Sequence, residues 1–582
     1  MTLEIPEFPS PSIVDSRRLM GPNLYSDRMG VVLEVKFEDD SAESLLAAWA
    51  AQATRLMASL GWGLPELHVR LEQGGASLFI CAAVDALMAS TEVNEQAWVL
   101  AERANSGEPD ASLVLRLRAS IDDERATKPN LATAYAAAID NSLVVTFDDE
   151  SLTVGVGSGS QTWPLAEIPE VAAIDWNTLG DVPIALVTGS NGKTTTTRLV
   201  AAMWRAAGRV AGWSCSDGVW VDDDRLEQGD YSGPAGARVV VRDTRVSAAV
   251  LETARGGILR RGLAVSRADA AIITNIAADH FGEYGMGSLR DLATAKGVVA
   301  RALGERGTLV LNADDPVLVE LAANMHARLA WFSMSAEHPA LDAHVLAGGD
   351  ATTLHGGRVM LHRDDVWHDL GDIAAMPLTL NGTATHNIEN ILGASLLASA
   401  VGVPVDDIRD TLATFGASAG DNPGRLQVYR FGGVTVLVDY AHNPDGLSAL
   451  CETAKEMPAE RRLVILGQAG NRGDDQLRAL ARAAWSVIPF DRVIVKEMLT
   501  MLRGRQPGEI PAILGDELSQ LGVPADRVEV APSELDAVRR AFAWAQDGDL
   551  LVCPVHIEKK GVLAWLKQLT DAGWVAGMPL PA

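Results

Sequence analysis

The amino-acid sequence predicts an α/β protein of several domains whose larger sheets are mostly parallel. Its 582 residues are too many for one hydrophobic core, since about 100–200 residues per domain is usual. From Pro183 onward, short apolar runs alternate with helix-like segments, which is the pattern of parallel strands joined by crossover helices. One of these runs passes into a glycine-rich turn and then a helix, in VTGSNGKTTTTRL (187–199).

The first part of the chain, residues 1–105, predicts a small N-terminal α/β domain. After a polar lead that contains prolines, GVVLEVKF (30–37) is typical of a strand, and residues 41–60 have the apolar spacing of a helix. We expect a second strand at LHVRLE (67–72) and a second helix at residues 93–104.

Residues 106–180 predict a connecting region rather than a large domain. We expect a strand at LVLRLRAS (113–120), a helix at LATAYAAAID (131–140) and short strands at SLVVTF (142–147) and LTVGVG (152–157). Acidic patches with glycine and serine separate these segments, as in connecting chain.

Two further α/β series follow, which predict a central domain at 181–420 and a C-terminal Rossmann-like domain at 421–582. Apolar runs of the central domain are IALVTG, RVVVRD (238–243), AAVLETA, AAIITNIA and GTLVLNADD. The C-terminal runs are in PGRLQVYRFGGVTVLVDYAHNP, RLVILGQAG, RVIVKE and DLLVCPV. A doubly wound sheet is expected in the central domain.

Charge and composition exclude several classes of function. The 76 Asp and Glu outnumber the 49 Lys and Arg, for a net charge of −27, so the chain repels nucleic acid and anionic membranes. The four cysteines are far apart, which argues against a disulfide framework or a zinc site. With no signal-peptide pattern and no long apolar span, we expect a cytoplasmic protein.

The turn GSNGK, between an apolar strand and a helix, predicts a phosphate-binding loop. Its backbone N–H groups and the helix N-terminus make a site for an anion. Lys193 suits the β- and γ-phosphates of ATP, and the Thr194 hydroxyl suits Mg²⁺. The general phosphate-loop pattern has glycine where this chain has Val187, so a turn that binds nothing is the alternative.

Polar residues at two later strand ends extend this candidate site. Glu252 ends the run AAVLE and is followed by a glycine-rich turn, where a carboxylate suits Mg²⁺, although a helix cap or surface charge is the alternative. The segment TNIAADHFGEYG (274–285) carries His280, which on its own would more often be structural.

These motifs together resemble those of the Mur ligase family. TGSNGKTT is similar to the family's shorter phosphate loop, and TNIAADHFGEYG, LNADDP (311–316), HNIENILGA (386–394) and VDYAHNPDGL (438–447) follow in the family's order. The resemblance covers residues 183–582. It implies ATP and Mg²⁺ as cofactors, with Thr194, Glu252 and His280 as metal ligands.

The resemblance also implies a role for each matching residue. Lys193, His280, Lys296 and Arg425 are the expected catalytic residues, and whether Lys296 is carbamylated stays open. The nucleotide is expected to contact the loop residues Gly189, Ser190, Asn191, Gly192, Lys193, Thr194 and Thr195. Further nucleotide contacts are expected from Asn312 and Asp314 at the adenine, Asn390, Arg425, Asp439 at the ribose, and His442 and Asn443 near the phosphates.

Within this family, the chain is most similar to the Mur ligase-like half of the cyanophycin synthetases. ARGGILRRGL (254–263), KEMLTMLRGRQPGE (496–509) and the N-terminal RRLMGPNLYS (17–26) carry that resemblance. Cyanophycin synthetases have an ATP-grasp domain for which residues 106–180 leave no room. Their N-terminal histidine motif reads AAVDA (82–86) here, so we expect that domain to dock or support rather than bind a metal.

The implied activity is an ATP-dependent carboxylate–amine ligase that works through an acyl phosphate. A basic amino acid such as arginine would join an aspartate-like carboxylate, with Arg255, Lys496, Glu497, Arg503 and Arg505 as candidate substrate contacts. A solvated basic loop is the alternative at 496–505. A ligase for another peptide or γ-glutamyl amide, and a non-catalytic nucleotide-binding subunit, are the competing functions. A homodimer or higher homo-oligomer is left open.

Overall fold

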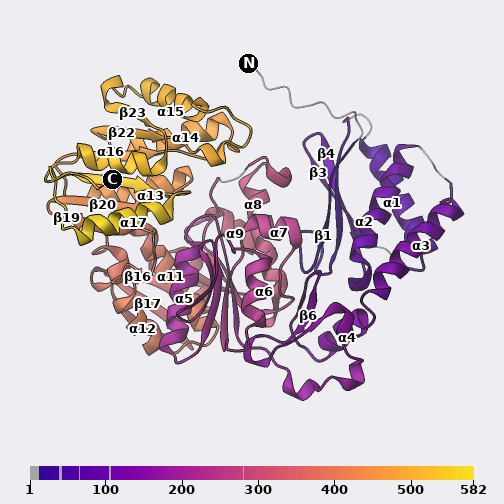
Figure 1. Cartoon of the computed structure of the whole chain (residues 1–582). Coiled ribbons are helices and arrows are strands. Elements are labelled where there is room, and N and C mark those ends of the chain that lie inside the picture. Colours follow the sequence, from indigo (N-terminus) through magenta and orange to yellow (C-terminus); the bar gives the residue numbers. More distant parts are fainter. Residues whose placement is uncertain (1–11, 39–41, 64–65, 104–106, 279–280, 582) are drawn as a thin grey trace.

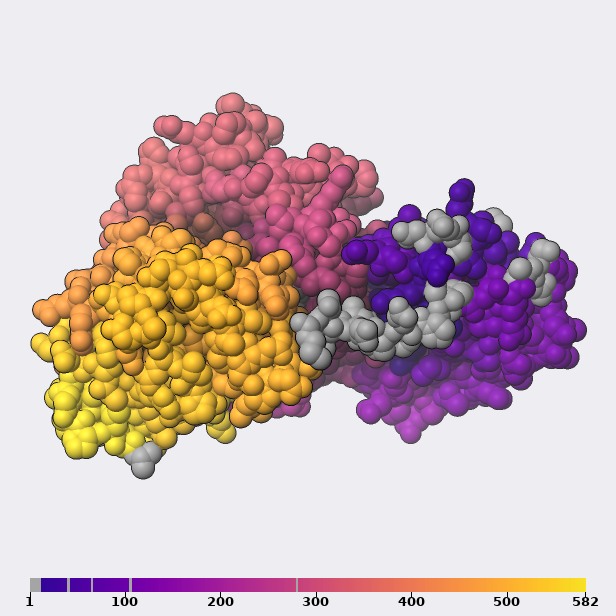
Figure 2. Space-filling view, turned by 90° about the horizontal axis from the view of Figure 1, so that it is seen from above, coloured from indigo at the N-terminus to yellow at the C-terminus, as the bar shows by residue number. Residues whose placement is uncertain are grey.

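The computed structural model describes residues 12–38, 42–63, 66–103, 107–278 and 281–581. The sheets lie in three parts of the molecule, with the N-terminal part and the C-terminal part on either side of the central one (Figure 1). The space-filling view shows the same arrangement from above (Figure 2). In the described ranges, no helix is long and apolar enough to cross a membrane.

The N-terminal part is an antiparallel sheet covered by helices. Its strands run in the order β1-β2-β4-β3, with α1 and α2 packed on each other and α2 packed on β2. The bounds are β1 (Ser12–Leu19), β2 (Gly30–Lys36), β3 (Leu67–Glu72), β4 (Gly75–Cys81), α1 (Ala42–Ser59) and α2 (Leu87–Glu102). The strands predicted at 30–37 and 67–72 and the helices predicted at 41–60 and 93–104 are confirmed over the described residues, which leave out 41 and 104, but α2 already starts at Leu87. The sequence did not predict β1 and β4.

Residues 107–180 differ in one element from the prediction. LVLRLRAS (113–120) is part of helix α3 (Ala111–Ala126), so the predicted strand is wrong. The buried side chains are Leu113, Leu117 and Ile121, spaced by one helical turn, and the Asp110 carboxylate caps the helix by accepting from the Ser112 N–H. Leucine and arginine alternate over residues 115–118, as polar and apolar residues do in a strand with one buried face, and both arginines, Arg116 and Arg118, are exposed on the helix.

The other elements of this region are α4 (Leu131–Asp140), as predicted, and a small antiparallel sheet of β5 (Val145–Phe147), β6 (Ser151–Val154) and β7 (Gln161–Pro164). Their buried side chains join those of the N-terminal sheet in one hydrophobic cluster. The predicted division at residues 105 and 106 therefore crosses a shared core, and the domain bounds remain a prediction.

The central sheet is mostly parallel, as predicted, with antiparallel strands at both edges. Its order is β11-β10-β9-β12-β8-β13-β14-β15-β16-β17-β18, and β9, β12, β8, β13, β14, β15 and β16 are parallel. The strand bounds are β8 (Ile184–Thr188), β9 (Ala211–Cys215), β10 (Gly218–Val221), β11 (Asp224–Gln228), β12 (Ala248–Glu252), β13 (Ala268–Ile273), β14 (Leu303–Asn312), β15 (Arg328–Ser333), β16 (Ala351–His355), β17 (Arg358–Arg363) and β18 (Val366–Asp372).

Helices cover both faces of this sheet. Their apolar side chains pack against those of the strands in two separate hydrophobic clusters, one on each face. Their bounds are α5 (Lys193–Ala206), α6 (Pro234–Arg242), α7 (Arg255–Arg261), α8 (Leu289–Gly297), α9 (Pro316–Ala322), α10 (Pro339–Leu346), α11 (Thr385–Ala400) and α12 (Val405–Thr414). RVVVRD (238–243) was expected as a strand and belongs to α6. Pro234 starts that helix, and Ala237, Val240 and Val241 are buried at helical spacing.

The C-terminal part is a parallel sheet with one antiparallel edge strand, β19, in the order β19-β20-β24-β21-β22-β23. This confirms a Rossmann-like arrangement. The strands are β19 (Gln427–Phe431), β20 (Val434–Asp439), β21 (Arg462–Leu466), β22 (Arg492–Lys496), β23 (Val528–Ala531) and β24 (Leu550–Pro554). The helices are α13 (Pro444–Glu456), α14 (Asp474–Val487), α15 (Glu509–Gln520), α16 (Glu534–Trp544) and α17 (Lys559–Asp571).

Candidate functional site

The turn between β8 and α5 is fastened to the end of the neighbouring strand β13. The Ser190 N–H donates to the Asn275 carbonyl at 2.9 Å, and the Thr274 hydroxyl donates to the Asn191 carbonyl at 2.6 Å. Gly189 and Gly192 have φ of +144° and +85°, and a side chain at either would collide with Thr274 or Asn390. The first N–H groups of α5 have no acceptor within the helix, so the loop is a rigid cradle for an anion.

Three side chains from different parts of the central sheet's connections meet at the start of α5: one from α5 itself, one from the end of β12 and one just after β9. The Thr194 hydroxyl donates to the Glu252 carboxylate at 2.8 Å and lies 2.9 Å from the Ser216 hydroxyl. Burial raises the pKa of Glu252, and the nearby positive charge of Lys193 partly offsets this effect. A buried hydroxyl and carboxylate side by side are hard oxygen donors, the kind that Mg²⁺ prefers.

Two lysines approach the phosphate loop. The Lys193 ammonium donates to the Ser190 carbonyl at 2.9 Å, and the Lys296 ammonium, which is buried, donates to the Gly189 carbonyl at 2.8 Å. Both positive charges therefore lie against the backbone that would surround a phosphate.

The segment that links the central and C-terminal parts reaches the same loop. The Arg425 guanidinium donates to the Ser216 hydroxyl at 2.8 Å and lies over the Tyr440 ring, 4.3 Å from its centre. The Asn422 amide donates to the Thr195 hydroxyl at 3.1 Å. The two parts are thus in contact across the candidate site.

Two more contacts join the C-terminal part to the central one. The Asn443 amide donates to the Asn191 side-chain oxygen at 2.9 Å, and the Lys559 ammonium pairs with Asp217 at 2.8 Å. Burial alone would raise the pKa of Asp217, but the charges of Arg425 and Lys559 outweigh it and hold that pKa below its usual value. Burial lowers the pKa of Lys559 even though Asp217 raises it, so loss of hydration offsets part of the attraction between the two charges.

These contacts surround a cavity of 1240 Å³ that lies between the two parts. The predicted residues that line it are Ser190, Asn191, Gly192, Lys193, Thr194, Thr195, Glu252, Arg255, Lys296, Asn312, Asp314, Asn390, Arg425, Asp439, His442 and Arg503. Gly189 and Asn443 are held just behind this lining by the contacts given above. Residues predicted from widely separated motifs are therefore brought together.

Several of the predicted nucleotide contacts are held by hydrogen bonds of their own. The Asn312 side chain accepts from the Asp314 N–H at 2.9 Å, and Asp314 accepts from the Ser333 hydroxyl at 2.6 Å. The Asn390 amide donates to the Asn387 oxygen at 3.1 Å, and Asp439 accepts from the Leu426 N–H at 2.7 Å.

The five predicted substrate contacts have different surroundings. Arg255 is buried in the cavity wall and pairs with Glu283, and Arg503 lines the cavity from the C-terminal part. Lys496 is fully buried, and its ammonium donates to Glu534 and to the Pro554 carbonyl, both at 2.6 Å.

The remaining two, Glu497 and Arg505, also make contacts within the C-terminal part. Glu497 accepts from the Gly508 N–H at 2.6 Å, and Arg505 pairs with Asp474 and Glu509. In the described part of the chain, Lys496, Glu497 and Arg505 do not line the cavity. Glu497 and Arg505 support the loop that carries Arg503, and Lys496 holds the end of β22 against β24 and α16.

The predicted metal ligand His280 lies outside the described residues. Within the described ranges, no cluster of three or more acidic, histidine or cysteine side chains forms a preassembled metal site. The oxygen donors of Thr194 and Glu252 nevertheless fit a magnesium ion that also binds phosphate and water.

Three partners at this site were not predicted from the sequence. Ser216 bridges Thr194 and Arg425, Tyr440 supports the Arg425 guanidinium, and Lys559 pairs with Asp217. Ser216 follows a short strand rich in small residues, and Lys559 follows the last strand, DLLVCPV, which the sequence did predict. Lys559 is the first residue of α17, so a polar residue at the start of the helix that follows that strand was the available signal.

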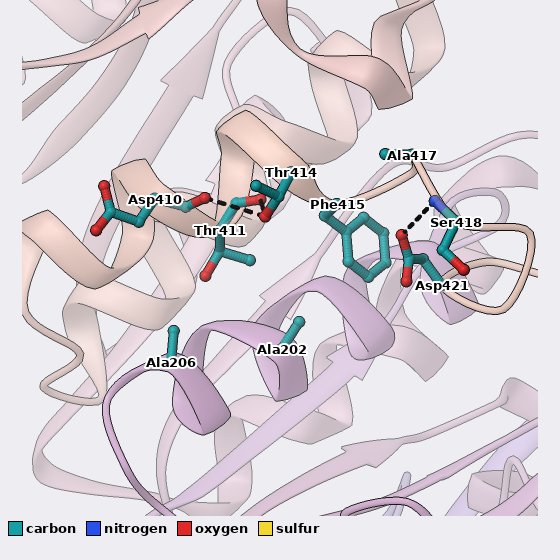
Figure 3. A pocket seen from close by; sticks show the side chains of 9 residues that line it. All are labelled: Ala202, Ala206, Asp410, Thr411, Thr414, Phe415, Ala417, Ser418 and Asp421. Atoms are coloured by element: carbon teal, nitrogen blue, oxygen red, sulfur yellow. Dashed lines mark hydrogen bonds between the residues drawn. The ribbon is translucent and has the colours of Figure 1, made fainter.

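A smaller cavity of 550 Å³ lies away from this site, over the C-terminal half of α5 (Figure 3). Ala202 and Ala206 form its floor, and Phe415 and Asp421 line its other side. The Asp421 carboxylate accepts from the Gly416 and Ser418 N–H groups, so it shapes the loop before Asn422. This hollow contains none of the predicted site residues.

Comparison with known proteins identifies the family. Residues 187–398 match the Mur ligase middle domain, and residues 424–554 match the Mur ligase glutamate ligase domain. The chain belongs to the Mur ligase family. Both matches fall within the sheets that meet at the cavity.

Curated Mur ligase relatives match a large share of the chain. The cyanophycin synthetase of Crocosphaera subtropica is 38% identical to this chain over an aligned region that covers 64% of this chain and 42% of that relative. The chain thus spans less than half the length of this relative. The UDP-N-acetylmuramoyl-L-alanyl-D-glutamate–2,6-diaminopimelate ligase of Geobacillus kaustophilus is 25% identical over 63% of this chain and 72% of its own. A solved structure of Escherichia coli FolC with ADP is 18% identical, covers 67% of this chain and 89% of its own, and has a TM-score of 0.46.

Proposed function

We propose that this Mur ligase family member is an ATP-dependent carboxylate–amine ligase that works through an acyl phosphate. The observation that carries the proposal is the reach of Arg425, from the link to the C-terminal part, to Thr194 and Ser216 beside the phosphate loop. A cation that reaches the phosphate site from a second domain suits transfer of a phosphoryl group inside a closed cavity.

The nucleotide would lie along the loop at 189–195, with its phosphates against the N-terminus of α5. Lys193 and Arg425 would offset the negative charge that moves with the γ-phosphoryl group toward the substrate carboxylate. Thr194 and Glu252 fit a magnesium ion, which when bound supplies further charge neutralisation at the phosphates. Their donors are already held in place by Ser216, so little rearrangement is needed.

Contact between the two parts has a further role in this reaction. Phosphorylation turns the carboxylate oxygen into a good leaving group, and water would hydrolyse the acyl phosphate if it had access. The contacts of Asn422, Asn443 and Lys559 hold the C-terminal part over the loop and limit that access. The amine then needs only to be positioned for attack.

We propose a basic amino acid such as arginine as the amine and an aspartate-like acid as the carboxylate. The 38% identity to a cyanophycin synthetase supports this choice, although the chain spans 42% of that protein's length. Arg255 would serve the acid, because it is buried in the wall next to Glu252. Arg503 lines the opposite, C-terminal side of the cavity.

The test is ADP release measured with every pairing of a panel of acids and a panel of amines, including arginine and lysine. The proposal predicts release only when both an acid and an amine are present, with formation of their amide. A ligase for another peptide or γ-glutamyl amide, in line with the 25% identical cell-wall ligase, would select a different pair. ATP turnover that is indifferent to both partners would contradict the proposal.

A further inference from the structure

One wall of the cavity carries several arginines at some distance from the nucleotide loop. α6 contributes Arg238, and α7 contributes Arg255, Arg260 and Arg261. Arg255 is paired with Glu283, but none of the other three forms an ion pair with a carboxylate in the described ranges. These guanidinium groups give one wall of the cavity a local positive charge, although the chain as a whole has a net charge of −27.

Arg238 has the poorest set of partners among them. Its Nε is buried without a hydrogen-bond acceptor, and one terminal nitrogen reaches the Met20 sulfur, a weak acceptor, at 3.9 Å. Burial lowers the pKa of Arg238, so its charge is incompletely compensated. The acids whose charges act on it, Asp148 and Asp149, are already paired with Arg242 and Arg18.

Arg260 and Arg261 are likewise available to a ligand. Arg260 Nε donates to the Tyr284 hydroxyl at 3.0 Å, and Arg261 donates to the Arg260 carbonyl at 3.5 Å. The positive charges of Arg242 and Arg261 also act on Arg238, and they oppose the effect of Asp148 and Asp149. Such an arrangement costs free energy in the empty protein and is relieved by a bound anion.

The N-terminal part of the chain holds this wall in place. The Met20 N–H donates to the Arg261 carbonyl at 2.8 Å, and the Leu263 N–H donates to the Pro22 carbonyl at 2.8 Å. The Arg17 Nε donates to the Leu259 carbonyl at 3.0 Å. Residues on both sides of β1's end therefore fix the helix that carries the arginines.

The wall is close to the site of chemistry along the chain. Glu252 ends β12, and α7 starts after only Thr253 and Ala254. The Ala254 N–H donates to the Ser232 carbonyl at 2.7 Å, which joins the start of α7 to the segment before α6. A substrate carboxylate at the phosphate loop would thus have its remaining groups near these arginines.

We propose that Arg238, Arg260 and Arg261 form a subsite for a second carboxylate of the acid substrate, which the N-terminal part helps to build. Arginine binds carboxylates through two parallel N–H donors, so this wall selects acids that carry more than one carboxylate. The proposal deepens the proposed ligase function and rests on it for the identity of the ligand as substrate.

The test compares binding of a tri-aspartate peptide and its tri-asparagine counterpart by calorimetry, without nucleotide. The unmodified protein is expected to bind tri-aspartate more tightly. The double variant Arg238→Gln/Arg261→Gln should weaken that binding by about tenfold or more, because charged hydrogen bonds are lost. The control is Arg290→Gln, which removes an arginine outside the cavity lining with an 81% exposed side chain and should change nothing.

ADP affinity and melting temperature are measured on the same variants. If the double variant loses tri-aspartate binding but keeps its affinity for ADP, the subsite is supported. This result does not depend on the turnover assay with acids and amines, so the subsite and the ligase activity are tested separately. Equal affinity of the double variant and the unmodified protein for tri-aspartate would overturn the subsite. A parallel loss of ADP affinity would also overturn it, since the arginines would then belong to the nucleotide site.

Discussion

The Thr194 hydroxyl, in the first turn of α5, donates a 2.8 Å hydrogen bond to the carboxylate of Glu252, the last residue of β12. β8 and β12 are parallel neighbours, so both side chains emerge at the same edge of the sheet. Both are buried, and the Ser216 N–H donates to the same carboxylate oxygen at 3.3 Å. The pair is thereby held in place at the wall of the cavity, beside the turn between β8 and α5.

The first prediction concerns magnesium dependence. Thr194→Val keeps the size of the side chain but removes its oxygen, so the Mg²⁺ concentration for half-maximal turnover should rise by about tenfold or more. Thr194→Ser keeps the hydroxyl and should stay close to the unmodified protein. A magnesium titration of ADP release checks both variants, and the same shift in the serine variant would argue against a role for the hydroxyl as a ligand.

The second prediction concerns the charge at the phosphate loop. Lys193→Met should lower turnover by roughly 10²–10³-fold, because a preorganised cation that stabilises the transition state is lost. The melting temperature of the nucleotide-free protein should change little, since Lys193 makes its one described hydrogen bond to the Ser190 carbonyl. Turnover within a factor of two of the unmodified rate would remove Lys193 from the catalytic residues.

The third prediction concerns contact between the central and C-terminal parts. Lys559→Met leaves the Asp217 carboxylate without one of its cations, and turnover at low ATP should fall. Asp217→Asn in the same chain removes the unpaired charge and should recover part of the loss. A double-mutant cycle on kcat/KM is expected to give a coupling of about 0.5–3 kcal/mol. Strictly additive effects would mean that the pair does not contribute to the working state.

The fourth prediction concerns the pH dependence of stability. Burial, followed by the charges of Asp314 and Asp315, raises the pKa of Glu389 from 4.5 to about 7. The folded state therefore holds a proton that the unfolded state releases between these values, so the free energy of unfolding falls as pH rises across this window. Glu389→Gln removes this dependence.

The measurement for Glu389 is thermal unfolding of both proteins without nucleotide, below pH 4.5 and above pH 7. The glutamine variant should gain in melting temperature relative to the unmodified protein as pH rises. A difference that stays constant across the window would mean that Glu389 titrates near its usual value in the folded protein.

Much of the fold and the site was predictable because parallel sheets place their functional residues at strand ends. Glu252, Asn312 and Asp439 each end an apolar run of this kind, and they do line one cavity. The strand predicted at 113–120 is wrong, because an alternation of leucine and arginine over a few residues is compatible with the repeat of a strand and with that of a helix. Only the packing of Leu113 and Leu117 on the N-terminal core selects the helix.

Side-chain partners from distant segments could not be predicted in this way. Lys496 follows a strand and is polar, yet its ammonium is buried against Glu534, which is 38 residues further along the chain. Arg238 lies in a segment that predicts a strand but forms α6, and its contact with the Met20 sulfur joins residues 218 positions apart. Such pairings are set by tertiary packing and leave no local pattern.

The proposed function depends on the claim that ATP activates a carboxylate before an amine attacks it. The most direct measurement uses an acid substrate with isotopically labelled carboxylate oxygens, in the presence of ATP and the amine. Activation through an acyl phosphate predicts that one labelled oxygen appears in the released inorganic phosphate for each amide formed. Amide formation with unlabelled phosphate, or labelled phosphate without any amide, would contradict the claim.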